Sequence, residues 1–155
     1  VHAAAIGNLV LLQILGGHCD DASALAAEWD AAAARLPRGA TRPRVVYLTG
    51  RARLVSRCLA DPARAEALTR EAVALLPALT DPDMSRLDRA SVIAQHAGHL
   101  GDLGRHAEAG TVLADGLRLV EGHADGDSVR LSILRLQANS AAASGDFAGA
   151  ALALE

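Results

Sequence analysis

The chain has 155 residues, of which 51% are hydrophobic but only 2% aromatic, and its formal net charge is −3. High apolar content with a small net charge excludes an intrinsically disordered chain. A core of Ala and Leu with few aromatic residues favours closely packed helices over a β-sandwich.

The first half of the chain divides into four predicted helices. They cover residues 3–15, 22–36, 44–59 and 62–76. Asp20 or Asp21 is the expected N-cap of the second helix. A loop rich in Pro, Gly and Arg is expected at 37–43. Asp61-Pro62 is a strong start for the fourth helix, because Asp caps and Pro suits the first helical position.

The second half of the chain also divides into four predicted helices. They cover residues 85–103, 106–120 and 127–144, and a last helix that is capped by Asp146 and runs to the end of the chain. Turns are expected at 81–83 and 122–126. No stretch shows the alternation of a β-strand, so the predicted fold class is all-α.

One hexapeptide pattern, Gly-x-(His/Phe)-Ala-x-Ala, occurs at 104–109 and again at 145–150. Gly suits the left-handed residue that ends a helix, and Ala lets two helices approach closely. We therefore expect Ala109 and Ala150 to be buried at close crossings. Ala24 and either Ala65 or Ala67 align with them in the first half, where Cys19-Asp20-Asp21 and Asp61-Pro62 replace the Gly turn.

These residues resemble the tetratricopeptide repeat. Ala97, Gly104 and Ala109 match the small residues and the Gly-containing turn of that family, and Leu113 follows them. Ala138, Gly145 and Ala150 match the pattern again. The resemblance covers residues 85–155 best. The chain departs from the family in its period of about 41 residues, against the usual 34 or so, and in having Leu100 and Ala141 where Tyr is common.

The resemblance implies a fold and a domain organisation. The expected fold is antiparallel helix pairs, about four hairpins, stacked as a right-handed superhelix. The hairpins would cover approximately residues 1–36, 43–77, 85–121 and 127–155 of a single repeat domain, 1–155. Because the chain opens without Met and stops inside an Ala/Leu helix, we expect it to be part of a longer polypeptide.

Long, Ala-rich repeats of this kind are similar to those of large bacterial transcription regulators. There the repeats follow a nucleotide-binding module and serve as a sensor or interaction arm. The resemblance thus implies a protein- or peptide-binding module. We expect no enzymatic activity, because the sequence shows no coupled acid–base or nucleophile arrangement, and no cofactor. The expected partners are a protein or peptide with an acidic segment and other domains of the same polypeptide; self-association is left open.

The resemblance also indicates which residues meet a partner, because the first helix of each pair lines the inner surface of such a superhelix. Arg135 and Asn139 are four residues apart, as in repeats that bind carboxylates, and Ser132 shares their face. Ser91 belongs to an open floor on the fifth helix, with Ala94, Gly98 and Gly101. The expected partner-binding residues are Arg53, Arg57, Ser91, Ser132, Arg135 and Asn139. The competing interpretation is a solvated helix face.

Charge is distributed unevenly along the chain. Seven arginines and no acidic residue lie between Asp30 and Asp61: Arg35, Arg38, Arg42, Arg44, Arg51, Arg53 and Arg57. Such a cluster can hold a phosphate, a nucleic acid or an acidic peptide. The alternative is pairing with acidic faces of neighbouring repeats. The negative overall charge and the lack of aromatic residues argue against direct nucleic-acid binding.

The alternative function is a helical enzyme or metal-binding protein that uses His96, His99 and His106. His96 and His99 share one helical face, but no Cys or carboxylate stands at a recognisable ligand spacing, so packed or solvent-facing histidines are favoured. Gly98, Gly101 and Gly104 lack the strand and the Lys of a phosphate loop. Close helix packing is the expected reason for these three glycines.

Cysteine content and the chain's start bear on its location. Cys19 and Cys58 form no metal-type spacing, and we expect both to be reduced and buried. The apolar stretch 1–17 lacks a basic leader and is too short to span a bilayer. We therefore expect a cytoplasmic protein that does not enter the membrane.

Overall fold

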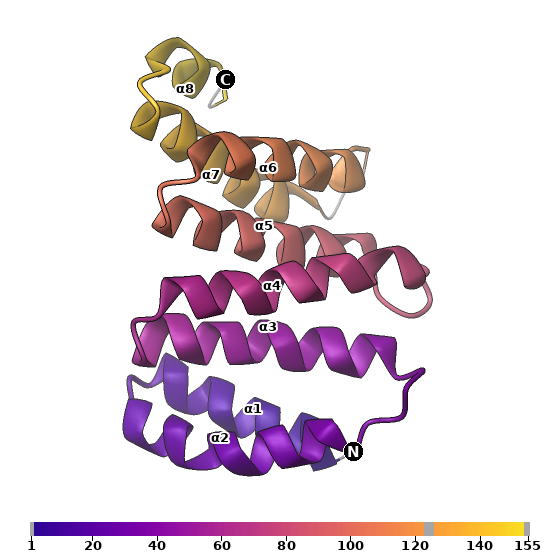
Figure 1. Cartoon of the computed structure of the whole chain (residues 1–155). Coiled ribbons are helices and arrows are strands. Elements are labelled where there is room, and N and C mark those ends of the chain that lie inside the picture. Colours follow the sequence, from indigo (N-terminus) through magenta and orange to yellow (C-terminus); the bar gives the residue numbers. More distant parts are fainter. Residues whose placement is uncertain (1, 123–125, 154–155) are drawn as a thin grey trace. The chain divides into compact units, whose positions relative to one another are not determined.

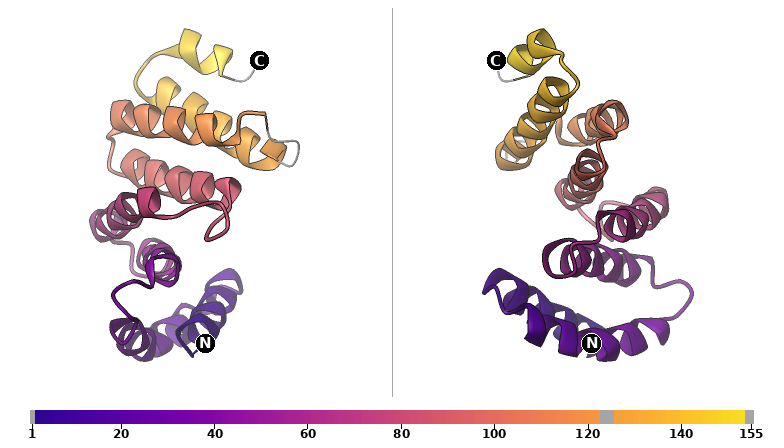
Figure 2. Two further views of the ribbon diagram at one scale, coloured as in Figure 1. Left: turned by 90° about the vertical axis from the view of Figure 1, so that its right-hand side faces the viewer. Right: turned by 60° about the vertical axis from the view of Figure 1, so that its left-hand side comes forward.

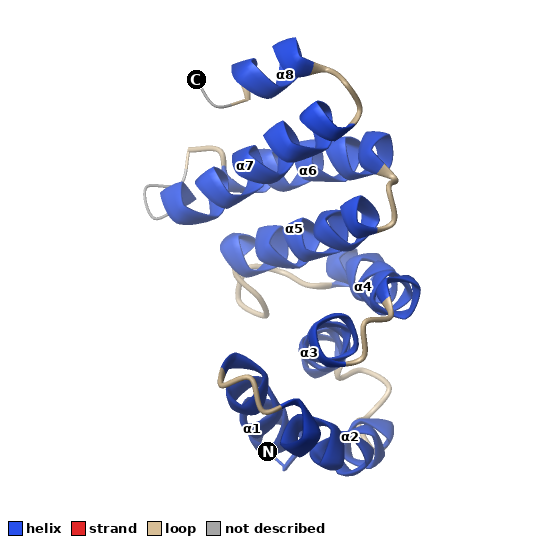
Figure 3. Cartoon of the chain, turned by 90° about the vertical axis from the view of Figure 1, so that its left-hand side faces the viewer, coloured by secondary structure: helices blue, strands red, loops and turns tan. Residues whose placement is uncertain are grey.

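The computed structural model describes residues 2–122 and 126–153, and every regular element in that part of the chain is a helix (Figure 3). The all-α prediction is thereby confirmed. Part of the predicted turn 122–126, and the end of the last predicted helix, lie outside the described residues.

The chain forms two compact units, Val1–Leu79 and Thr80–Glu155. The helices of the first unit are α1 (His2–Leu15), α2 (Cys19–Ala34), α3 (Thr41–Cys58) and α4 (Pro62–Leu75), followed by the 3-10 turn η1 (Leu76–Ala78) (Figure 1). The helices of the second unit are α5 (Arg86–Asp102), α6 (His106–Val120), α7 (Asp127–Ala143) and α8 (Phe147–Leu152).

Each unit contains two helical hairpins that pack in the same way. In the first unit α1 pairs with α2 and α3 pairs with α4, while α3 also packs on both α1 and α2. In the second unit α5 pairs with α6 and α7 pairs with α8, while α7 also packs on both α5 and α6 (Figure 2). The first helix of each hairpin therefore contacts the first helix of the next hairpin in its unit.

The turns inside the hairpins share one backbone design. Each contains a residue with positive φ, and these residues are Gly17, Ala60, Gly104 and Gly145. The next residue is the N-cap of the following helix: His18, Asp61, Arg105 and Asp146. In the three Gly turns, the N-cap amide donates to the carbonyl oxygen five residues earlier at 2.8–2.9 Å. This bond satisfies a carbonyl that the ending helix leaves unpaired.

A small residue follows each N-cap by four positions: Ala22, Ala65, Ala109 and Ala150. The first three are fully buried, so the hairpins cross closely at these points. The register predicted for the first half is corrected, because Ala24 is exposed and Ala65, rather than Ala67, is the fully buried residue. The expected burial of Ala150 is wrong, because α8 has six residues and contributes none to the described core.

Two helix starts differ from the prediction. Asp20 and Asp21 lie in the first turn of α2 rather than at its N-cap. In the first turn their negative charges still interact favourably with the positive end of the helix. Helix α3 begins at Thr41, so Pro43 lies in its first turn. Pro is tolerated there because the amide that it lacks would have no helical partner.

Each unit has its own apolar core. The second unit buries Ala90, Ala97, Leu100, Ala109, Leu113, Val120 and Ile133 in one cluster. The first unit buries Ile6, Val10, Ala22, Trp29, Ala32 and Leu54 in one cluster and Ala52, Val55 and Ala65 in another. Alanines form a large share of these cores, as the composition predicts.

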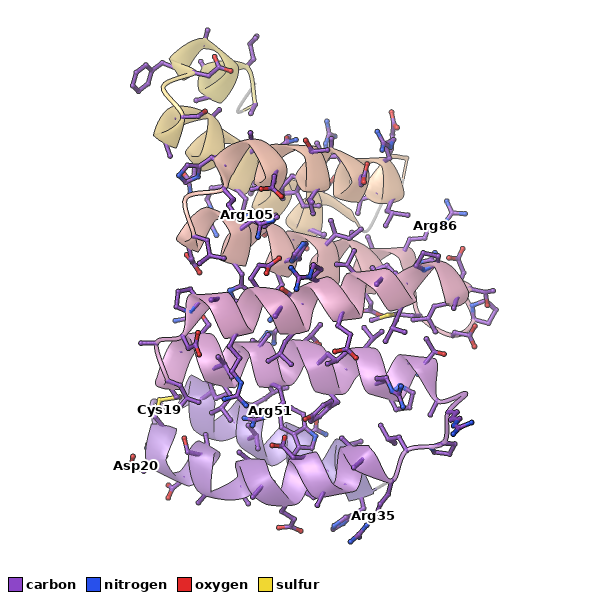
Figure 4. All side chains as sticks on the ribbon, viewed as in Figure 1. Cys19, Asp20, Arg35, Arg51, Arg86 and Arg105 are labelled. Atoms are coloured by element: carbon purple, nitrogen blue, oxygen red, sulfur yellow. A yellow bond between two sulfur atoms is a disulfide. The ribbon has the colours of Figure 1, made fainter. Side chains whose placement is uncertain are left out.

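Cys19 and Cys58 form a disulfide, which corrects the prediction that both are reduced and buried. Both side chains are half-buried. The bond joins the first residue of α2 to the last residue of α3, whose Cα atoms are 5.3 Å apart (Figure 4). The two cysteines meet because the turns after α1 and after α3 lie at the same end of the first unit. Sequence spacing alone gave no sign of this pairing.

Candidate functional site

The only tryptophan of the chain organises the first unit. Trp29 is 2% exposed and lies against two glycines, Gly7 of α1 and Gly50 of α3. A Cβ at Gly7 would be 2.8 Å from the indole ring, and one at Gly50 would overlap it. Tyr47 of α3 packs edge-on against the ring, with the two ring centroids 5.3 Å apart. The indole therefore occupies space that only glycine at both positions leaves open.

Asp30, the residue after Trp29, joins α2 to α3 through polar contacts. The Tyr47 hydroxyl donates to its Oδ1 at 2.8 Å, and Arg51 Nη2 donates to its Oδ2 at 2.9 Å. Arg51 is only 7% exposed, and its Nε also lies 2.8 Å from Oδ1. Burial, and then the hydrogen bond to Asp30, raise the pKa of Tyr47 above its ordinary value. One member of the Arg-rich segment thus pairs with the acidic residue of a neighbouring hairpin.

The other six arginines of that segment have no carboxylate partner in the part of the chain that the structure describes. They are Arg35, Arg38, Arg42, Arg44, Arg53 and Arg57, and all but the half-buried Arg44 are exposed. One stripe along α3 is formed by residues that are four or seven positions apart: Arg42, Val46, Arg53 and Arg57. Two predicted partner-binding residues, Arg53 and Arg57, therefore share a helix face with Arg42.

A cleft of about 330 Å³ lies in the first unit. Helix α1 contributes Ala3, Ala4, Gly7, Asn8 and Leu11, helix α3 contributes Arg42, Pro43, Val46 and Tyr47, and Trp29 comes from α2. Seven of these ten residues are apolar or Gly. We name this feature the α1–α3 cleft. The prediction did not include it, because its apolar lining looks like ordinary core in the sequence.

A smaller hollow of about 270 Å³ lies between α5 and α7 in the second unit. Its lining consists of Ser91 and Ala94 from α5 with Ser128, Val129 and Ser132 from α7. Two predicted residues, Ser91 and Ser132, therefore meet across one hollow. Each hydroxyl donates to the carbonyl four residues earlier in its own helix, at 2.9 Å. Both hydroxyl oxygens keep acceptor capacity, but the hydrogens are engaged.

The remaining two predicted residues continue the α7 side of that hollow. Arg135 and Asn139 follow Ser132 at helical spacing, so Ser128, Ser132, Arg135 and Asn139 lie along one stripe of α7. Both side chains are exposed. We name Ser91, Ala94, Ser128, Ser132, Arg135 and Asn139 the α5–α7 face. Arg53 and Arg57 belong to the other unit.

The glycines of α5 do not have the packing role that the spacing predicted. A Cβ at Gly98, Gly101 or Gly104 would meet no atom within 4 Å, apart from its immediate neighbours. Gly104 is explained by its φ of +73° in the turn. Gly98 and Gly101 leave one side of α5 without side chains at these positions. Glycines that do allow close packing include Gly7 and Gly50, at Trp29, and Gly116, whose Cβ would lie 3.2 Å from Ile93 and Ile133 side chains.

The three histidines do not gather as metal ligands. His96 and His99 are each 7% exposed, and His106 is half-buried on α6. Within residues 2–122 and 126–153, no group of three or more His, Cys, Asp or Glu side chains is arranged to hold a metal ion. Near His106, the Arg105 guanidinium donates to both carboxylate oxygens of Glu108 at 2.8 and 2.6 Å, which lowers the pKa of Glu108.

Compared with models of known protein families and with the sequences of curated proteins, the chain matches none. Of the helices that the structure describes, none combines the length and the apolar content needed to cross a bilayer.

Proposed function

We propose that this protein is a binding module for protein or peptide segments, built from tetratricopeptide-like hairpins. The observation that carries the proposal is the α5–α7 face. It combines a hollow floored by Ser and Ala with an exposed Arg135 and Asn139 that have no ion pair or side-chain hydrogen bond among the described residues. A guanidinium beside an open helix face suits an extended or helical segment that carries carboxylates.

The repeated turn supports the repeat part of the proposal. A left-handed residue, an N-cap and an Ala recur in the same order in four hairpins. Repeated hairpins in contact with their neighbours are the construction principle of helical solenoids, which use extended surfaces for binding. A right-handed superhelix and a role as the interaction or sensor arm of a cytoplasmic bacterial transcription regulator are the finer parts of this proposal. A nucleotide-binding module or a helix-turn-helix encoded in the same gene would support them.

Binding to labelled peptides rich in Asp and Glu tests the proposal, with Asn/Gln versions of the same peptides as a reference. We expect the acidic peptides to bind more tightly than their Asn/Gln versions. Their binding should weaken as salt rises, because exposed charges are screened over about 8 Å at physiological ionic strength. Arg135→Ala should weaken binding by about fivefold, the equivalent of ~1 kcal/mol. The melting temperature should stay unchanged, because an exposed Arg contributes little to folding.

Arg130→Ala is the matched control. Arg130 is an exposed arginine of the same helix, but it lines a different cavity, beside Leu117 and Leu134. It should therefore leave peptide affinity unchanged apart from a small effect at low salt. Affinity that is indifferent to both salt and Arg135→Ala would place the binding surface elsewhere on the molecule.

A further inference from the structure

The α1–α3 cleft is polar at one end and apolar along its length. The lining residues Ala3 and Ala4 belong to the first turn of α1, and Arg42 and Pro43 belong to the first turn of α3. The positive end of α3 therefore lies at this end of the cleft. Helix α3 has no acidic residue in its first turn to offset it. Arg42 adds a full charge there, and it has no carboxylate partner in the described residues.

The rest of the cleft offers apolar surface with few hydrogen-bonding groups. Gly7, Leu11, Trp29 and Val46 line it, and Val46 is 44% exposed. The Tyr47 hydroxyl, one of the few polar groups of the lining, already donates to Asp30 at 2.8 Å. A peptide backbone would find few partners for its amides and carbonyls here, and unpaired polar groups are costly to bury. A ligand with one anionic group and a hydrocarbon part fits this distribution better.

We propose that the α1–α3 cleft binds a small apolar carboxylate. The carboxylate meets Arg42 at the start of α3, and the hydrocarbon part lies along Gly7, Leu11 and Val46 against the edge of Trp29. The cleft volume of about 330 Å³ falls within the range of small-molecule sites, about 300–1,000 Å³. This inference is independent of the proposed peptide binding, because the α5–α7 face belongs to the other unit.

Trp29 gives the test a direct readout, because it is the only tryptophan in the chain. Octanoate titrated into the whole protein should change the tryptophan fluorescence saturably, and octanol, which lacks the charge, should bind at least about tenfold more weakly. Arg42→Ala should weaken octanoate binding by about tenfold and leave octanol binding unchanged. Ala4→Leu should weaken both ligands, because the longer side chain fills the cleft.

The controls separate this site from general effects of charge and from the proposed peptide site. Arg38→Ala removes an exposed arginine that does not line the cleft, and it should leave octanoate affinity unchanged. Arg135→Ala should also leave it unchanged. The proposal is overturned if octanoate gives no saturable change in fluorescence. It is equally overturned if octanoate and octanol bind alike, or if Arg38→Ala and Arg42→Ala weaken octanoate binding to the same degree. Circular dichroism of each variant confirms that the helices are intact.

Discussion

At the scale of single residues, the glycines of this chain divide into those that make room and those that do not. Gly50 leaves space for the Trp29 ring, whereas a Cβ at Gly98 would meet no atom within 4 Å other than its immediate neighbours. The same substitution should therefore act in opposite directions at the two positions. Gly lowers helix stability relative to Ala wherever packing does not require it.

We expect Gly50→Ala to lower the free energy of unfolding by about 1–3 kcal/mol through overpacking against Trp29. Gly98→Ala should raise it by about 0.5–1 kcal/mol, because it removes the helix penalty of Gly in the interior of α5. Chemical denaturation of both variants measures the two changes. Equal destabilisation by both substitutions would contradict the packing described around Trp29.

Tyr47 makes the stability of the first unit dependent on alkaline pH. Burial, and then the hydrogen bond to Asp30, raise its pKa above 10.0, so the folded state favours the neutral phenol. This contribution is fully present below the unfolded-state pKa and is lost as pH rises through the folded-state pKa. The chain has one Tyr and no Lys, and both cysteines are in the disulfide. Tyr47 is therefore the side chain that titrates in this range.

We expect the free energy of unfolding to fall as the pH rises above about 10 and the fall to be absent in Tyr47→Phe. The variant should be less stable at neutral pH, because it leaves Asp30 with one donor fewer. Denaturation at several pH values, together with the ultraviolet absorbance of tyrosinate, measures both effects. An identical alkaline fall in wild type and Tyr47→Phe would assign the pH dependence to another group.

At the scale of elements, one turn design ends the first helix of every hairpin, and one copy departs from it. Ala60 occupies the left-handed position with φ of 50°, where the other three turns have Gly. A Cβ in this conformation costs about 1–2 kcal/mol, whereas Gly is nearly free of the penalty. The turn before α4 is held by Asp61, whose side chain accepts from the Arg64 amide at 3.0 Å.

Reciprocal substitutions test this turn. Ala60→Gly should stabilise the protein by up to about 1 kcal/mol, after the extra freedom of Gly in the unfolded chain is taken into account. Gly104→Ala should destabilise it by about 1–2 kcal/mol, because α5 and α6 fix residue 104 at a φ of +73°, where a Cβ is unfavourable. Thermal unfolding of the two variants measures both changes. A stabilising Gly104→Ala would mean that this turn is not held in the left-handed conformation.

Most helices were predictable because their ends have local signals. Asp61-Pro62 caps α4, and the predicted Asp146 accepts from the Gly149 amide at 2.8 Å at the start of α8. The start of α2 was misjudged because its N-cap, His18, makes no side-chain capping bond. There the preceding Gly17, not an Asx residue, sets the turn. A residue that shapes a turn only through its backbone dihedrals is harder to recognise in the sequence than a residue that caps a helix with its side chain.

At the scale of the whole molecule, the candidate sites were predictable only where they follow helix periodicity. The meeting of Ser91 with Ser132 follows from first helices that pack on one another. The α1–α3 cleft depends on where Trp29 of α2 inserts between α1 and α3, and two distant glycines, Gly7 and Gly50, decide that position. The disulfide likewise joins residues 39 positions apart. Contacts between residues so far apart in the sequence are set by tertiary packing, so no local sequence pattern predicts them.

The disulfide and the Trp29 cluster lie within the first unit, so reduction of the protein should weaken one unit selectively. Closing a loop of this length contributes about 4 kcal/mol at most in the chain-entropy account. Hydrogen exchange read by mass spectrometry, with and without a reductant, should show protection falling in α1, α2 and α3 while α5, α6 and α7 keep theirs. The double variant Cys19→Ser/Cys58→Ser is the control, because a reductant should change nothing further in it. An equal loss of protection in both units would contradict the selective effect. Detection of two free thiols in the protein before reduction would show that the disulfide does not form.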